Sequence, residues 1–276
     1  MKLLSLFILL TRKKLIMTVF DIPILSIEEF EEFLISVSSG STDSVESSIV
    51  FPYNLADLYS LYLSVRNNRI VAILEFGSGW STLALTIALE ENRRSFSKYI
   101  ELNVRHPNAF TIMTVDCSEK YQAVALKRIP DNLATIRIIP VVSDARMTVL
   151  NGQYCHIFDQ LPPFTADFVY LDGPDCNQVV GNVGGFSVKF GSNEDCYGLP
   201  MAADVLLLEP FFWPGTILIT DGRGANASFL KSNFKRNWLY NYDKDLDQHY
   251  FKLLEAPFGS ISESLLTLKV GLQEVD

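Results

Sequence analysis

The sequence has few residues of the types that build metal sites and disulfide frameworks. Its 276 residues include four cysteines and three histidines. No two cysteines form a C-x-x-C pair, so neither a structural zinc site nor a secreted disulfide framework is indicated. Cys176 and Cys196 bracket a glycine-rich segment and could form one bridge, but buried or incidental thiols in a reducing compartment are the simpler interpretation.

Positive charge is also scarce. The chain carries 23 Lys and Arg residues against 32 Asp and Glu, which gives a net charge of −9. This balance argues against a general nucleic-acid-binding protein, because such proteins present a basic face. Apolar residues make up 48% of the chain and aromatic residues 12%, which indicates a folded globular protein.

Long apolar runs are absent. The run from Leu3 to Leu10 is too short to span a bilayer. Basic residues at 12–14 follow this run, which is the reverse of the order in a signal peptide. We therefore expect residues 1–16 to be an extension outside the fold, with Met17 as a second candidate start; a weak contact with a membrane surface is the alternative. Without a targeting signal, the cytoplasm is the default expectation.

Two helices are predicted before the first strand. Ser26 and Glu29 match a capping box that opens a helix through about Val37. Asn54 is expected to cap a second helix, after a polar linker at residues 38–48. Residues 17–65 are thus predicted to be a helical cap on a main domain at residues 66–276.

From residue 66 onward, strand and helix patterns alternate, as in a parallel sheet with helices on both faces. The predicted strands are Ile70–Glu75, Thr111–Val115, Ile136–Val142, Phe168–Leu171 and Thr216–Thr220. The predicted helices are Leu83–Glu91, Glu119–Ile129, Pro200–Phe212 and Asn226–Phe234. Two further strands, Trp238–Tyr242 and His249–Leu254, flank a polar turn. The predicted fold class is α/β: a doubly wound, mostly parallel seven-stranded sheet with helices on both faces and a C-terminal antiparallel hairpin.

The stretch Arg69–Glu91 is the most informative part of the chain. An apolar strand leads into the turn Glu75-Phe-Gly-Ser-Gly and then into an apolar helix. Gly77 and Gly79 remove side chains that would keep a ligand away from the backbone. The dinucleotide fingerprint requires a small residue at position 82, where this chain has Thr82. A P-loop requires a Lys after the turn, and none is present there. The acidic residue at position 75 suits a cationic ligand better than a pyrophosphate.

This segment resembles the first motif of the class I S-adenosylmethionine (SAM) dependent methyltransferases, E/D-x-G-x-G. In that family the glycine turn approaches the amino-acid end of SAM, and the acidic residue helps to hold its ammonium group. The resemblance covers roughly residues 50–256 and implies a SAM-dependent methyltransferase, with an oxygen of a small-molecule or glycan-type acceptor as the expected methylation site. The cofactor-binding residues predicted at this turn are Glu75, Phe76, Gly77, Ser78, Gly79 and Ser81.

An acidic residue follows every predicted parallel strand, at the edge where open sheets bind ligands. These residues are Glu75, Asp116, Asp144, Asp172 and Asp221. The resemblance assigns Asp116, with the adjacent Cys117, to the SAM ribose. It assigns Asp144 to the adenine amino group, where Ala145 leaves room for the ring. The alternatives are a helix-capping role for Asp116 and an ordinary turn role for Asp144.

Asp172, in the sequence LDGPD, is the preferred general base and also a predicted cofactor contact, with Asp221 and His249 as the other catalytic candidates. In several O-methyltransferases the position of Asp172 supplies a metal ligand or a catalytic acid/base, and Asp221 could join it. Metal-dependent members place Asn after the residue that corresponds to Asp221, where this chain has Gly222. One oxygen ligand is therefore missing, which argues against a divalent ion, and no metal ligand is assigned. Substitute ligands would be Asp175 and Asn177.

The glycine-rich segment 173–210 has low helix and strand propensity and is predicted to be a substrate lid, or else a simple insertion. Two other function classes remain. One is an NAD(P)-dependent oxidoreductase, against which Thr82 and Glu75 count. The other is a non-catalytic binding protein on the same fold. The sequence does not indicate an oligomeric state.

Overall fold

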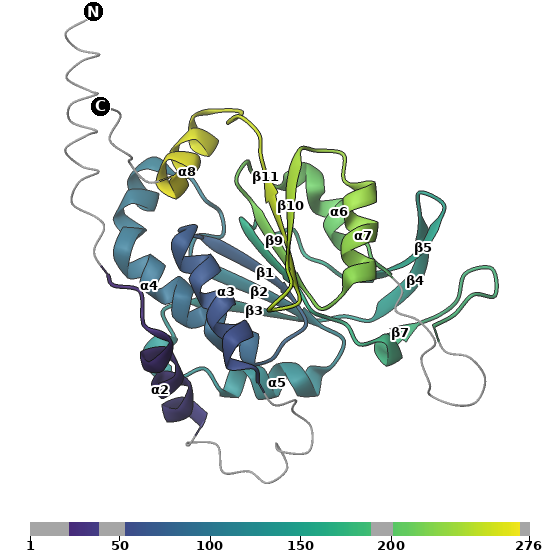
Figure 1. The fold of residues 1–276 in the computed structure, drawn as a ribbon, viewed down its shortest axis with the longest axis horizontal. Coiled ribbons are helices and arrows are strands. Elements are labelled where there is room, and N and C mark those ends of the chain that lie inside the picture. Colours follow the sequence, from purple (N-terminus) through teal and green to yellow (C-terminus); the bar gives the residue numbers. More distant parts are fainter. Residues whose placement is uncertain (1–21, 39–52, 189–200, 271–276) are drawn as a thin grey trace, which may run out of the picture.

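The larger sheet has seven strands in the order β10-β11-β9-β6-β1-β2-β3 (Figure 1). The computed structural model describes residues 22–38, 53–188 and 201–270. All neighbouring pairs are parallel except those of β11, which runs antiparallel to both β9 and β10. The strands are β1 Ala72–Phe76, β2 Thr111–Asp116, β3 Arg137–Val142, β6 Phe168–Leu171, β9 Ile217–Asp221, β10 Trp238–Asp243 and β11 Gln248–Leu253. This topology confirms the predicted fold class.

Helices cover both faces of this sheet. Helices α3, α4 and α5 lie on one side, and α6 and α7 lie on the other (Figure 1). The helices are α2 Ile27–Ser38, α3 Leu55–Asn67, α4 Trp80–Asn103, α5 Glu119–Lys127, α6 Asp204–Leu208, α7 Gly224–Asn233 and α8 Ser260–Val270. Among the described residues, no helix is both long and apolar enough to cross a membrane.

Side-chain alternation along the strands builds a separate core on each face. Ile73 and Phe168 pack in a cluster with residues of α2, α3 and α4. Their neighbours Leu74 and Val169 pack in the opposite cluster with Phe229 of α7. Because both faces are covered, the strands read as apolar runs rather than as alternating patterns.

A second sheet, in the order β7-β4-β5-β8, was not predicted. Its centre is an antiparallel hairpin of β4 (Ala145–Leu150) and β5 (Gln153–Phe158), and its edges are β7 (Val179–Val180) and β8 (Met201–Ala202). Within the segment 173–210, only these two short edge strands pair with the hairpin, and the lid role of the segment stays a prediction. Residues 189–200, with Cys196, lie outside the described residues. The predicted helix at 200–212 is shorter, because a 3₁₀ turn at Glu209–Phe211 follows α6.

Helix α4 extends past its predicted end at Glu91 to Asn103. The extension is stabilised because Phe96 and Ile100 on one face bury against Leu265 and Leu268. The last two residues belong to α8, a helix that was not predicted. Phe96 has non-helical backbone angles, so the long helix is kinked there.

The predicted helix starts near the N-terminus are confirmed. Ser26 and Glu29 form the reciprocal hydrogen bonds of a capping box. Asn54 accepts a hydrogen bond from the backbone N–H of Ala56 at 3.0 Å. The expectations for residues 1–16 and for Met17 fall outside the described residues.

Candidate active site

A cavity of about 370 Å³ opens at the carboxyl ends of β1, β2, β6 and β9. Its size lies within the roughly 300–1,000 Å³ typical of small-molecule sites. Its lining is Tyr53, Asn54, Asp57, Leu58, Gly77, Ser78, Gly79, Trp80, Ser81, Asp116, Tyr121, Val124, Arg128, Tyr170, Asp172, Gly173, Pro174, Asp175, Gln178 and Asp221. The structure therefore gathers the glycine turn and three of the five predicted strand-end carboxylates around one space.

The glycine turn packs backbone to backbone against the turn after β6. Gly77 has φ of +91°, and a Cβ atom there would lie 2.9 Å from the nitrogen of Gly173. A Cβ atom on Gly173 would lie 2.6 Å from the Cα of Gly77. Both positions therefore exclude a side chain on steric grounds. Gly79 differs, because its φ of −175° is extended and a Cβ atom would meet nothing within 4 Å.

Replacing Gly79 with valine is expected to abolish ligand binding and leave the fold intact, because the new side chain would occupy open cavity space at a backbone conformation that any residue adopts. Calorimetric titration with SAM and thermal unfolding of the same sample measure the two effects. Gly173→Ala is the contrasting variant, for which we expect a lower melting temperature as well as lost binding. A Gly79→Val protein that binds SAM normally would contradict the assignment of this turn to the ligand.

Glu75 lies beneath the turn and outside the cavity lining. Its carboxylate accepts hydrogen bonds from Ser81 Oγ at 2.6 Å and from Thr82 Oγ1 at 2.8 Å. Burial raises the pKa of this fully buried group to about 7. Glu75 thus ties β1 to the start of α4, and its contact with a ligand ammonium group stays a prediction. Phe76 also lies outside the lining, in the core beside Phe158.

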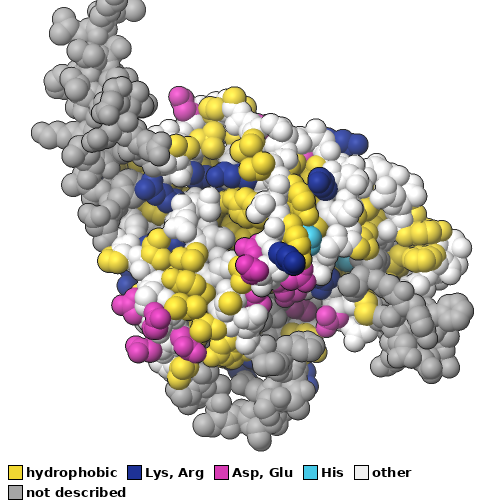
Figure 2. Space-filling view, in the orientation of Figure 1, with side chains coloured by type: hydrophobic (Ala, Val, Ile, Leu, Met, Phe, Trp, Pro, Cys, Tyr) yellow, Lys and Arg dark blue, Asp and Glu magenta, His cyan; other side chains and the backbone are white. Residues whose placement is uncertain are grey.

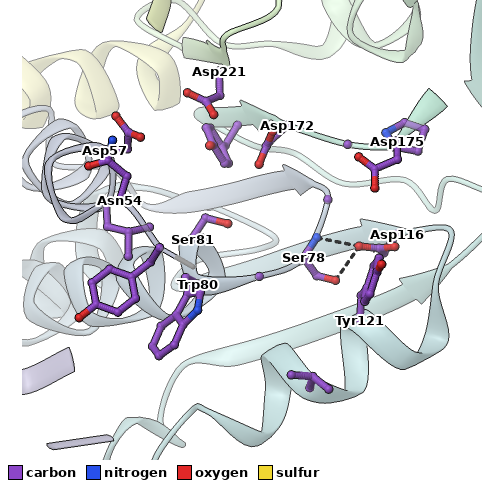
Figure 3. Close-up of a pocket in the computed structure, with 18 of the residues that line it drawn as sticks. Asn54, Asp57, Ser78, Trp80, Ser81, Asp116, Tyr121, Asp172, Asp175 and Asp221 are labelled. Carbon is purple, nitrogen blue, oxygen red and sulfur yellow. Dashed lines mark hydrogen bonds between the residues drawn. The ribbon is translucent and has the colours of Figure 1, made fainter. Parts of the chain in front are cut away.

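Asp116 joins the end of β2 to the glycine turn. Its Oδ2 accepts hydrogen bonds from the backbone N–H and the hydroxyl of Ser78, at 2.8 and 2.7 Å (Figure 3). Its Oδ1 accepts from the N–H of Ser118 at 2.7 Å. A carboxylate offers about four acceptor positions, so it retains capacity for a ligand hydroxyl. This position on the cavity wall is compatible with the predicted ribose contact.

Four more carboxylates form an acidic end of the cavity: Asp57, Asp172, Asp175 and Asp221. Asp57 comes from α3, Asp172 and Asp175 from the loop after β6, and Asp221 from the end of β9 (Figure 3). Acidic side chains gather near the centre of the face shown in Figure 2. Carboxylates in such proximity repel one another, which favours either protonation or a cationic ligand.

The pKa values of Asp57, Asp172 and Asp221 are raised, with desolvation as the largest cause. Asp172 is accessible from the cavity but crowded by protein, and desolvation followed by the charge of Asp221 raises its pKa to about 7. Desolvation, with the charges of Asp57 and Asp247, raises the pKa of Asp221 to about 6. The pKa of Asp57 is also raised, mainly by desolvation. Near neutral pH, Asp172 is therefore poised to take up or release a proton.

Arg223 holds the turn that carries Asp172. Its guanidinium donates hydrogen bonds to the backbone carbonyl of Asp172 and, at 3.1 Å, to that of Pro174. The opposing charge of Arg223 also lowers the pKa of Asp172, although desolvation and Asp221 have the larger effects. Arg223 therefore fixes the backbone of the acidic end.

Besides Glu75 and Phe76, four other predicted site residues lie outside the cavity lining. His249 is buried, with Nδ1 3.0 Å from the Tyr240 hydroxyl, and desolvation lowers its pKa. Cys117 is half-buried and has its pKa raised to about 11 by burial. Asp144 is exposed and Ala145 is buried in β4. After β3 the chain continues into the unpredicted hairpin rather than into a helix, and neither Asp144 nor Ala145 lines the cavity. Their assigned roles stay predictions.

Sequence reasoning missed the opposite wall of the cavity. Trp80 follows the glycine turn directly and packs against Tyr53 in a tilted arrangement, with a centroid distance of 4.8 Å. Tyr121, Val124 and Arg128 face the cavity from α5 and its C-cap. Their spacing of three and four residues is a helical-face signal that could have identified them. In contrast, the contribution of Asp57 depends on where α3 docks.

Within the described parts of the chain, no group of three or more His, Cys, Asp or Glu side chains is placed to hold a metal ion.

No family model and no curated protein sequence matches this chain. Solved structures match it in overall arrangement. An O-methyltransferase from Streptomyces achromogenes involved in tomaymycin synthesis, in complex with SAM, is 12% identical with a TM-score of 0.43, over 80% of this chain and 90% of that chain. An O-methyltransferase from Bacillus cereus in complex with SAH is 15% identical with a TM-score of 0.40, over 85% and 93%. A methyltransferase from Geobacter sulfurreducens is 14% identical with a TM-score of 0.44, over 84% and 100%. These identities and TM-scores show a likeness of fold alone.

Proposed function

We propose that this chain is a SAM-dependent methyltransferase. The observation that carries the proposal is the convergence on one cavity of the side-chain-free turn at Gly77–Gly79, the linked carboxylate of Asp116 and the acidic end. The turn admits a ligand close to the backbone, and the carboxylate can accept from a ribose hydroxyl. The acidic end suits the ammonium and sulfonium groups of the cofactor electrostatically.

The proposed reaction is methylation of an oxygen on a small-molecule or glycan-type acceptor. When bound, SAM supplies a methyl group on a positively charged sulfur, and transfer breaks the carbon–sulfur bond as the oxygen–carbon bond forms. The protein holds the acceptor hydroxyl in line with that methyl group. Asp172 accepts the hydroxyl proton, for which a pKa of about 7 is well matched. Asp221 lies beside it as the second candidate.

Calorimetric titration of the purified chain with SAM, S-adenosylhomocysteine (SAH) and NAD, in parallel, tests the cofactor. Micromolar binding of SAM and SAH, without binding of NAD, is the expected result. Binding of NAD alone would instead favour an oxidoreductase. If none of the three binds, the chain is not a methyltransferase, and a non-catalytic role takes its place.

A further inference from the structure

The cavity is electrically asymmetric. Five aspartates line it, of which Asp57, Asp172, Asp175 and Asp221 form the acidic end. Arg128 is the single Lys or Arg among the described lining residues. It lies over Trp80, and Figure 3 shows Trp80 and Tyr121 on the side of the cavity away from Asp172 and Asp221. A ligand with separated positive and negative groups would therefore be oriented by the cavity.

Arg128 is held in a defined position. Its guanidinium carbon lies 4.4 Å from the centroid of the Trp80 ring, a cation–π arrangement. The side chain is 7% exposed although it belongs to the cavity lining. Tyr53 packs against the Trp80 ring in turn. A planar guanidinium fixed on an aromatic face is well suited to bidentate binding of a carboxylate.

The start of α4 adds positive potential at the same wall. Gly79, Trp80 and Ser81 line the cavity at the N-terminus of this 24-residue helix. The helix dipole places partial positive charge there. The guanidinium and the helix terminus thus favour an anionic group on this side of the glycine turn.

We infer that Arg128, held over Trp80, binds the carboxylate of the amino-acid end of the cofactor. This inference rests on the proposed function and assigns a cofactor-positioning residue beyond it. The ammonium and sulfonium groups face the acidic end, while the carboxylate faces Arg128. The cavity thereby distinguishes a complete cofactor from one that lacks the carboxylate.

Two ligands isolate this contact: SAH, and S-adenosyl-3-thiopropylamine, which is SAH without its carboxylate. We expect the wild-type chain to bind SAH about ten- to a hundredfold more tightly, as for a charge-assisted hydrogen bond. In Arg128→Met this ratio is expected to fall close to one, through weaker SAH binding and unchanged binding of the decarboxylated ligand. Arg128→Lys, which keeps the charge but not the planar fork, is expected to retain part of the ratio.

Arg137→Met is the matched control, because Arg137 is exposed at the start of β3 and lies outside the cavity lining. Its preference for SAH over the decarboxylated ligand is expected to equal that of the wild type. Unchanged binding of the decarboxylated ligand also shows that Arg128→Met has folded. If Arg128→Met does not fold, the same ratio measured in Arg128→Lys tests the inference. A wild-type ratio in Arg128→Met overturns the inference while SAM dependence stands, as does an undiminished wild-type ratio in Arg128→Lys. If turnover is then lost in the variant, Arg128 is assigned to the acceptor. If the wild-type chain binds neither ligand, the proposed function itself fails.

Discussion

Replacing Asp172 with asparagine is expected to lower the rate of methyl transfer by about 10²–10⁴-fold, the usual contribution of a general base. Binding of SAH is expected to weaken far less than the rate, because three carboxylates remain at the acidic end and the turn is held through backbone carbonyls by Arg223. Single-turnover rates with an identified acceptor, together with SAH titration, separate the two effects. A variant with full activity would remove Asp172 as the base.

The pH dependence gives an independent readout of the same residue. A base is active when ionised, so with a pKa of about 7 the value of kcat/KM is expected to rise as the pH increases through neutrality. The Asn variant is expected to lose this rise. A bound sulfonium or ammonium group nearby stabilises the ionised form, so the rise in kcat is expected at a lower pH than that in kcat/KM.

Asp175→Asn is the matched control for this experiment. Asp175 lines the same cavity, and the substitution removes the same charge from the acidic end. We expect a much smaller loss of rate and a preserved rise with pH. Equal losses in the two variants would indicate that the acidic end acts through its total charge and that neither residue is a specific base.

Replacing Lys269 with methionine is expected to lower the free energy of unfolding by about 3–5 kcal/mol, as for a broken buried ion pair. Lys269 of α8 lies 3.0 Å from Asp167, and both side chains are buried. Asp167 also accepts hydrogen bonds from the N–H groups of Val71 and Ala72, at the start of β1. The variant leaves an uncompensated carboxylate at the junction of β1, β6 and α8. Urea unfolding measures the loss.

The double variant Asp167→Asn/Lys269→Met is expected to recover part of that stability, because the unpaired buried charge is then gone. Lys127→Met serves as the control, since Lys127 is exposed and its removal is expected to change stability by no more than about 0.5 kcal/mol. If Lys269→Met unfolds like the wild type, the ion pair does not anchor α8.

The sequence was most informative where the signals are local. The apolar strands, the capping residues and the Gly77–Gly79 turn depend on neighbouring residues, and all three appear in the structure close to their predicted positions. The carboxyl ends of adjacent parallel strands meet at one edge, so Asp116, Asp172 and Asp221 could be expected to converge. Their presence in one cavity agrees with that reasoning.

The β4–β5 hairpin shows where local reasoning was insufficient. Burial alternates along β4 but not along β5, and the two strands pair with β7 and β8, which are distant in sequence. After β3 the chain enters this hairpin at Ala145 rather than a helix, and Asp144 is not among the residues that line the cavity. The C-terminal helix α8 was missed for a similar reason, because its buried ion pair joins residues a hundred positions apart in the chain.

The sequence by itself determined the fold class, the glycine turn and the acidic character of the cavity, because strand periodicity, glycine turns and strand-end residues are short-range properties. Only the tertiary structure decided which side chains complete the cavity. Docking of α3 brings in Asp57, and the packing of α5 beside the start of α4 places Arg128 over Trp80. These placements depend on how whole elements pack together, and packing is set by complementary surfaces rather than by the order of neighbouring residues.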